Sequence, residues 1–134
     1  MNLVDLQVSI YDALTAANLP VVGIYDNVLQ VSDPSNNALF PFITVGDQST
    51  REWGDDCYTG HDAEIRIHVW SRAHHTLEVK GILGDVRDVL NRGPLSVQDG
   101  SVLTVDHLNT QVLKDPDGVT LHGIAAFRAL ITDN

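Results

Sequence analysis

The sequence Lys114-Asp115-Pro116-Asp117-Gly118 lies between two runs rich in β-branched and apolar residues, Ser101 to Lys114 and Val119 to Thr132. Proline presets φ at the start of a turn, and glycine accepts the positive φ that such turns require. A Pro-Asp-Gly turn between two β-rich runs of similar length is typical of a hairpin. The sequence therefore predicts that the chain ends in a long antiparallel ribbon.

Two further strands are predicted upstream of this ribbon. Apolar and polar residues alternate over Ala63 to Trp70, so one side faces the core and the other carries Glu64, Arg66, His68 and Trp70. The core-facing residues are Ile65, Ile67 and Val69. Phe40 to Val45 is β-branched and aromatic, which predicts the preceding strand. The polar residues Gln48 to Gly60 predict a long loop between the two.

Two amphipathic helices are predicted by apolar residues at helical spacing. The first covers Leu3 to Ala17 and ends before Pro20, because proline disfavours helical geometry at the residue that precedes it. The second covers Thr76 to Asn91 and has a broad apolar stripe. Gly81 and Gly84 within it indicate either close packing against the sheet or a tolerated cost in helix stability.

The predicted order is helix, two strands, helix and then two or three strands, which indicates an α+β protein. We expect an antiparallel or mixed β-sheet with two helices packed on it and a long C-terminal β-hairpin. A length of 134 residues fits one domain, residues 1–134, and is enough to bury a core without cross-links.

Composition limits the possible partners and compartments. The formal net charge of -10 argues against DNA binding, because phosphate contacts depend on clustered Lys and Arg, and the eight here are scattered. The single cysteine, Cys57, excludes an internal disulfide and is compatible with a reducing compartment. The start of the chain, Met1 to Asp5, has no basic region followed by a long apolar run. We therefore expect a soluble protein without a signal peptide or membrane span.

Motifs for catalysis and metal binding are missing from the sequence. His61, His68, His74 and His75 lack the spacing of a metal site such as His-Glu-x-x-His. Cys57 has no patterned histidine partner, and the glycines form no nucleotide-binding pattern. We expect no enzymatic activity, no cofactor and no metal. The alternative is a hydrolase with an unrecognised site.

Six segments carry a family resemblance: Ile10-Tyr11-Asp12-Ala13-Leu14, Gly23-Ile24-Tyr25-Asp26, Phe40-Pro41-Phe42-Ile43-Thr44-Val45-Gly46, Ile67-His68-Val69-Trp70-Ser71-Arg72, Val86-Arg87-Asp88-Val89-Leu90 and Leu113 to Leu130. In this order and at this spacing they resemble the tail-terminator (tail-completion) proteins of long-tailed phages and phage-like gene transfer agents. The resemblance implies a homohexameric ring that ends the tail tube at its head-proximal end. It also implies contacts with the tail tube protein and the head-tail connector or stopper protein. Genomic DNA would pass through the ring without specific binding, in a particle assembled in the host cytoplasm.

This resemblance places the expected functional residues at interfaces and around a channel. We expect interface contacts at Trp53, Trp70, His68, Asp115 and Asp117, and an acidic loop facing the DNA channel at Glu52, Asp55 and Asp56. Trp70 is chosen because a large aromatic side chain on the polar-facing side of a strand often marks an interface. A second layer, such as a helix covering that face, is the alternative for Trp70. The alternative functions are another head-tail joining protein, such as a stopper or head-completion subunit, and a small α+β ligand-binding module.

Overall fold

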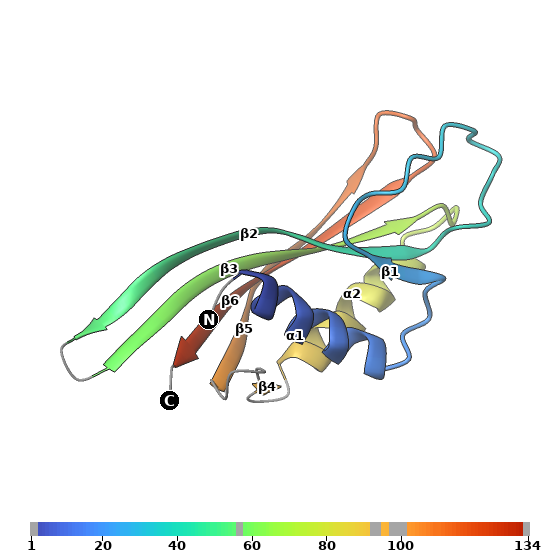
Figure 1. Cartoon of the computed structure of the whole chain (residues 1–134). Coiled ribbons are helices and arrows are strands. Elements are labelled where there is room, and N and C mark those ends of the chain that lie inside the picture. Colours follow the sequence, from blue (N-terminus) through green and yellow to red (C-terminus); the bar gives the residue numbers. More distant parts are fainter. Residues whose placement is uncertain (1–2, 56–57, 92–94, 97–101, 133–134) are drawn as a thin grey trace.

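The computed structural model describes residues 3–55, 58–91, 95–96 and 102–132. Along the chain the elements are α1 (Leu3–Ala16), β1 (Gly23–Tyr25), β2 (Phe42–Asp55), β3 (Tyr58–Ser71), α2 (Leu77–Leu90), β4 (Leu95–Ser96), β5 (Val102–Lys114) and β6 (Leu121–Thr132). The six strands form one sheet in the order β1-β2-β3-β6-β5-β4. Figure 1 shows both helices on one side of this sheet and the β2–β3 hairpin running past them. The predicted α+β class, with two helices and a C-terminal hairpin, is confirmed.

The C-terminal hairpin has the predicted strands and turn. β5 and β6 pair antiparallel from Val102 opposite Thr132 to Lys114 opposite Leu121. In the turn, the Gly118 N–H donates to the carbonyl of Asp115 at 3.0 Å, and Gly118 has a φ of 77°. This left-handed conformation is the one that glycine adopts without steric cost, so the turn chemistry explains the hairpin.

The predicted loop over Gln48 to Gly60 is wrong. β2 continues to Asp55 and β3 begins at Tyr58, so these polar residues form a long antiparallel hairpin. A register shift between Gly46 and Ser49 breaks the alternation that would mark a strand in the sequence. Backbone pairing across the hairpin satisfies the N–H and C=O groups whatever the side chains are, so the strands persist through a polar segment.

The sheet is mixed because of a short strand that the sequence did not predict. β1 pairs parallel with β2, with Gly23 opposite Phe42 and Tyr25 opposite Thr44, and all other neighbouring strands are antiparallel. Three residues carry too little periodicity to identify a strand.

The core lies between the helices and the sheet. Ile65, Ile67 and Val69 are fully buried, as their alternation predicts. The helices contribute Leu6, Ile10, Leu14, Val79, Val86 and Leu90, all less than 2% exposed. Both helices match their predicted ranges to within a residue at each end. The apolar periodicity therefore identified the buried faces correctly.

The helix glycines do not mark the closest contact between α2 and the sheet. A Cβ added at Gly81 or Gly84 would meet nothing within 4 Å, so the close-packing interpretation is wrong. The close approach is at Gly123 of β6, where an added Cβ would lie 2.6 Å from Leu83 Cδ1 and 2.9 Å from Val79 Cγ2. The glycine that allows α2 to pack closely on the sheet is therefore in strand β6 and not in the helix.

Candidate functional site

A row of rings crosses the face of the sheet opposite the helices. The indole of Trp70 stacks on the imidazole of His122, with centroids 3.8 Å apart and planes at 9°. His68 Nδ1 lies 2.6 Å from His122 Nε2, close enough for one ring nitrogen to donate to the other. Trp70 Nε1 donates to Thr44 Oγ1 at 3.3 Å. Alternation along β3 thus places His68 and Trp70 on the side away from the core, as predicted, where they form one cluster with His122.

Trp70 stands at the margin of a small second core. Phe42 is its cross-strand neighbour on β2, with ring centroids 6.1 Å apart, and is fully buried. Phe40 and Tyr25 pack on Phe42 at 5.1 Å and 5.9 Å between centroids. In the described part of the chain both helices lie on the opposite face, so the layer beside Trp70 is not a helix (Figure 1). The segment between β1 and β2 supplies the partial cover, and Trp70 remains half-buried.

Arg72, just after β3, fixes that covering segment to the sheet. The residue is 7% exposed, and its guanidinium lies 4.4 Å from the centroid of the Phe40 ring. Its Nε donates to Thr120 Oγ1 at 3.1 Å. Its terminal nitrogens donate to three backbone carbonyls, those of Val31 (3.0 Å), Asp33 (2.8 Å) and Asn36 (2.7 Å). One buried cation therefore joins the segment between β1 and β2 to the β5–β6 turn. The planar guanidinium of arginine suits this role because its several N–H donors point in fixed directions.

The acidic β5–β6 turn beside Arg72 is held by hydrogen bonds within the subunit. Asp117 accepts hydrogen bonds from the Thr120 hydroxyl (2.6 Å) and from the N–H groups of Thr120 and Val119 (2.9 Å each). These bonds lower the pKa of Asp117, and Arg72, 3.8 Å away, lowers it further. Burial raises the pKa of Asp115, and the charge of Asp117 adds to this effect. Turn geometry thus accounts for the Asp117 carboxylate, whereas Asp115 takes part in the turn through its backbone N–H and carbonyl.

The predicted interface residues fall into three places. His68 and Trp70 lie together on the outer face, whereas Asp115 and Asp117 belong to the β5–β6 turn. Trp53 lies in β2, where it pairs with Gly60 near the far end of the β2–β3 hairpin.

The predicted acidic channel loop is corrected in the same region. Glu52 and Asp55 are strand residues of β2 rather than loop residues. Asp56 and Cys57 lie outside the described residues. An acidic segment at the end of a hairpin thus replaces the predicted loop.

Arg72 and His122 were not predicted from the sequence, although a signal for Arg72 was present. The alternation that places His68 and Trp70 on the outer side continues to Arg72, so its position on that face could have been predicted. The position of His122 depends on the pairing of β6 with β3, which sets it opposite Trp70.

Metal-binding and membrane-spanning features are absent from the described parts of the chain. There, no three His, Cys, Asp or Glu side chains are grouped to hold a metal ion. Among the same residues, no helix is both long and apolar enough to cross a membrane.

Comparison with solved structures shows where this fold has been seen. A chain of the virion of a native gene transfer agent particle has the same fold, with a TM-score of 0.79 and 20% sequence identity. The match covers 96% of this chain and 95% of that chain. Two helices on one face of a mixed six-stranded sheet are therefore a fold found in a virion particle.

Sequence comparison identifies the family. The chain is 29% identical over 112 residues to the tail completion protein gp17 of Bacillus phage SPP1, a match that covers 83% of each protein. Residues 9–132 match the family described as tail completion protein gp17, and the chain belongs to that family. It is a structural protein of a virion tail, and not an enzyme.

Proposed function

We propose that this protein is a tail terminator, whose copies form a closed homohexameric ring on the head-proximal end of the tail tube. The ring stops tube growth and offers its other side to the head-tail connector or stopper protein. Family membership supports the tail role, and the two open edges of the sheet support assembly into a ring.

The open edges of the sheet are the main structural support for assembly into a ring. β1 pairs with β2 only at residues 42–44, and β4 pairs with β5 only at residues 102–103. Among the described residues, β2 from 45 to 55 and β5 from 104 to 114 have no strand on their outer edge. Such long edges are templates for pairing with another chain, and proteins rarely leave them uncovered.

Joining the two edges gives a contact that propagates around a ring. β5 runs antiparallel to β2 within the sheet, so β5 of one copy can pair antiparallel with β2 of the next. The two edges differ, which makes the contact head-to-tail, and head-to-tail contacts close into rings when the rotation fits.

The charge of the chain suits a channel through which DNA slides. At a net charge of -10 the subunit repels phosphates rather than holding them. We assign Glu52, Asp55 and Asp56 to the channel side and the row around Trp70 and His68 to contacts with a tail protein. Trp53 and the turn with Asp115 and Asp117 complete the proposed contact surfaces.

Electron microscopy of intact particles tests this function. We expect six copies in one ring between the tail tube and the connector. A single copy, or a position away from the upper end of the tail, would contradict the ring. A ring in contact with the portal side but separated from the tube would instead identify a stopper or head-completion subunit.

A further inference from the structure

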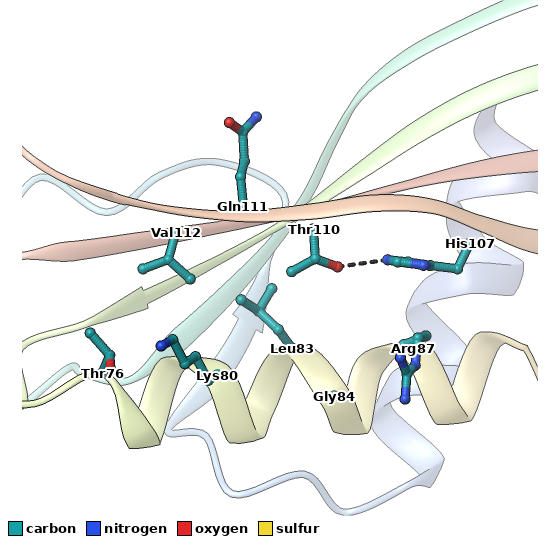
Figure 2. A pocket seen from close by; sticks show the side chains of 9 residues that line it. All are labelled: Thr76, Lys80, Leu83, Gly84, Arg87, His107, Thr110, Gln111 and Val112. Carbon is teal, nitrogen blue, oxygen red and sulfur yellow. Dashed lines mark hydrogen bonds between the residues drawn. The ribbon is translucent and has the colours of Figure 1, made fainter.

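A basic groove opens between α2 and β5, on the same side of the sheet as both helices. It has a volume of about 750 Å³. Figure 2 shows Val112 and Thr110 of β5 on the side of the strand toward α2, and Gln111 pointing away from the helix. The floor of the groove includes Leu83, Gly84 and Val112, and its rim carries Lys80, Arg87 and His107. We call this the α2–β5 groove.

Few side chains of the subunit itself fill or pair across the α2–β5 groove. Gly84 contributes no side chain, and a Cβ there would meet nothing within 4 Å. Within the described residues Lys80 forms no ion pair, and the guanidinium of Arg87 pairs only with the exposed carboxylate of Asp88, at 3.6 Å. Lys80 and Arg87 thus place two positive charges beside the apolar residues of the floor, in a chain whose net charge is -10. Charge complementarity favours an acidic segment with apolar side chains as the occupant.

The α1 helix carries such a segment on its outward face. Leu6, Ile10 and Leu14 bury one face of α1, whereas Val4, Val8 and Tyr11 are 67%, 39% and 41% exposed. Their spacing of four and three residues places these three side chains in one stripe. Asp5 and Asp12 add negative charge along one side of the stripe. Exposed apolar stripes of this kind mark contact surfaces, and helices often dock into grooves through them.

The charges on the two helices have matching separations. Asp5 and Asp12 are seven residues apart on α1, and Lys80 and Arg87 are seven residues apart on α2. Seven residues correspond to about 10.5 Å along a helix and return to nearly the same face. Two helices lying side by side would therefore bring both acidic positions close to both basic positions at once.

The stripe and the groove cannot meet within one subunit. α1 packs against β2 and one side of α2, whereas the groove lies on the β5 side of α2. Both helices occupy the same face of the sheet (Figure 1). If β5 of one copy pairs with β2 of the next, α1 of the second copy arrives beside the open groove of the first.

We propose that the α2–β5 groove of each copy binds the Val4-Val8-Tyr11 face of α1 from the neighbouring copy. This contact rests on the proposed ring. It forms a second layer of the subunit interface, beneath the pairing of β5 with β2. Leu83 and Val112 receive the apolar stripe, Gly84 leaves room for it, and Lys80 and Arg87 face its acidic side.

Site-specific cross-linking in assembled particles tests the contact. The chain would carry Val8→Cys and Gly84→Cys together with Cys57→Ser, so that only the two new thiols can pair. Under mild oxidation we expect covalent multimers that stop at the size of the ring. The matched control, Val8→Cys with Leu113→Cys, puts the second thiol at a 47% exposed position on the opposite face of the sheet, and should give no multimers.

Charge exchange supplies a second readout. Adding Lys80→Glu and Arg87→Glu should lower the cross-linked yield at least about tenfold, and adding Asp5→Lys and Asp12→Lys as well should restore it. A ring seen by microscopy without Val8–Gly84 cross-links would overturn this contact and leave the ring intact. Loss of assembly on groove substitution without those cross-links would also overturn it, since the groove would then bind another protein. Particles without a ring would overturn the proposed function itself.

Discussion

The indole of Trp70 and the imidazole of His122 lie parallel at 3.8 Å on adjacent strands, although 52 positions separate them in the sequence. The stack leaves Trp70 half-buried on the face of the sheet that has no helix. Such a ring is held rigidly and still offers an edge to a partner, which is the usual state of an aromatic interface anchor.

We expect Trp70→Ala to leave the monomer folded and to reduce particle assembly. Loss of the stack should lower the free energy of unfolding by about 1–2 kcal/mol, and truncation of an interface tryptophan commonly costs about 2 kcal/mol or more in binding. Urea unfolding of the subunit and counts of complete particles measure the two effects. Trp70→Phe, which keeps a ring over His122, is the control. An unfolded monomer would mark Trp70 as ordinary core, and normal particles would remove it from the interface.

Arg72→Lys should destabilise the subunit by about 2–4 kcal/mol and expose the loop between β1 and β2 to protease. Lysine keeps the charge but cannot serve Thr120 and three backbone carbonyls at once, so buried acceptors lose their donors. Arg66→Lys is the matched control, because Arg66 is half exposed and its pair with Glu64 is worth about 0.5 kcal/mol or less. Equal stability of the two variants would show that the Arg72 network contributes nothing specific.

Asp117→Asn should be less stable than the parent at neutral pH, with a difference that shrinks in acid. The pKa of Asp117 is below its ordinary value of 3.8 in the folded state, so its ionised form stabilises the fold above that pH. This contribution is lost as the pH falls from 3.8 through the folded-state pKa. Below that pKa the Asp117 carboxyl of the parent is neutral, as the asparagine side chain is at every pH. Thermal unfolding from about pH 7 to about pH 2.5 follows the difference.

Asp115→Asn should have the opposite sign at neutral pH. The folded state raises the pKa of Asp115, so its ionised form opposes folding, and removing the charge should hold or raise stability. The same pH series should show the variant and the parent converging below the raised pKa. If both turn variants lose stability equally at neutral pH, the assigned pKa directions are wrong.

Gly123→Ala should lower the free energy of unfolding by about 1–3 kcal/mol, because the new methyl group overlaps Leu83 and Val79 of α2. Gly81→Ala, where the added carbon meets nothing, should instead raise it by about 0.5–1 kcal/mol through helix propensity. Chemical denaturation of both variants provides the comparison. A stable Gly123→Ala protein would show that α2 does not need this close approach.

Affinity for double-stranded DNA should be negligible at physiological salt. A chain of net charge -10 gains little from counterion release on contact with phosphates. Fluorescence anisotropy with a labelled duplex is the measurement. Micromolar binding with a steep salt dependence would reveal a basic surface facing the channel and contradict the passive passage of DNA.

Local patterns in the sequence determined both helices, the buried face of β3 and the C-terminal hairpin. Each depends on residues within a few positions of one another: helical spacing in α1 and α2, alternation from Ala63 to Trp70, and the Pro-Asp-Gly turn at 116–118. The order and spacing of the six segments that resemble tail-completion proteins also indicated the family, because both are properties of the sequence itself.

Tertiary structure alone decided the β2–β3 hairpin beyond Gly46, the parallel strand β1, the Arg72 network and the α2–β5 groove. Arg72 reaches partners 36 to 48 positions away, and His122 meets His68 across 54. The polar hairpin is held by backbone pairing across two strands, and the groove lies where α2 faces β5 with the side-chain-free Gly84 in its lining. These features depend on contacts between distant segments, which side-chain periodicity does not encode.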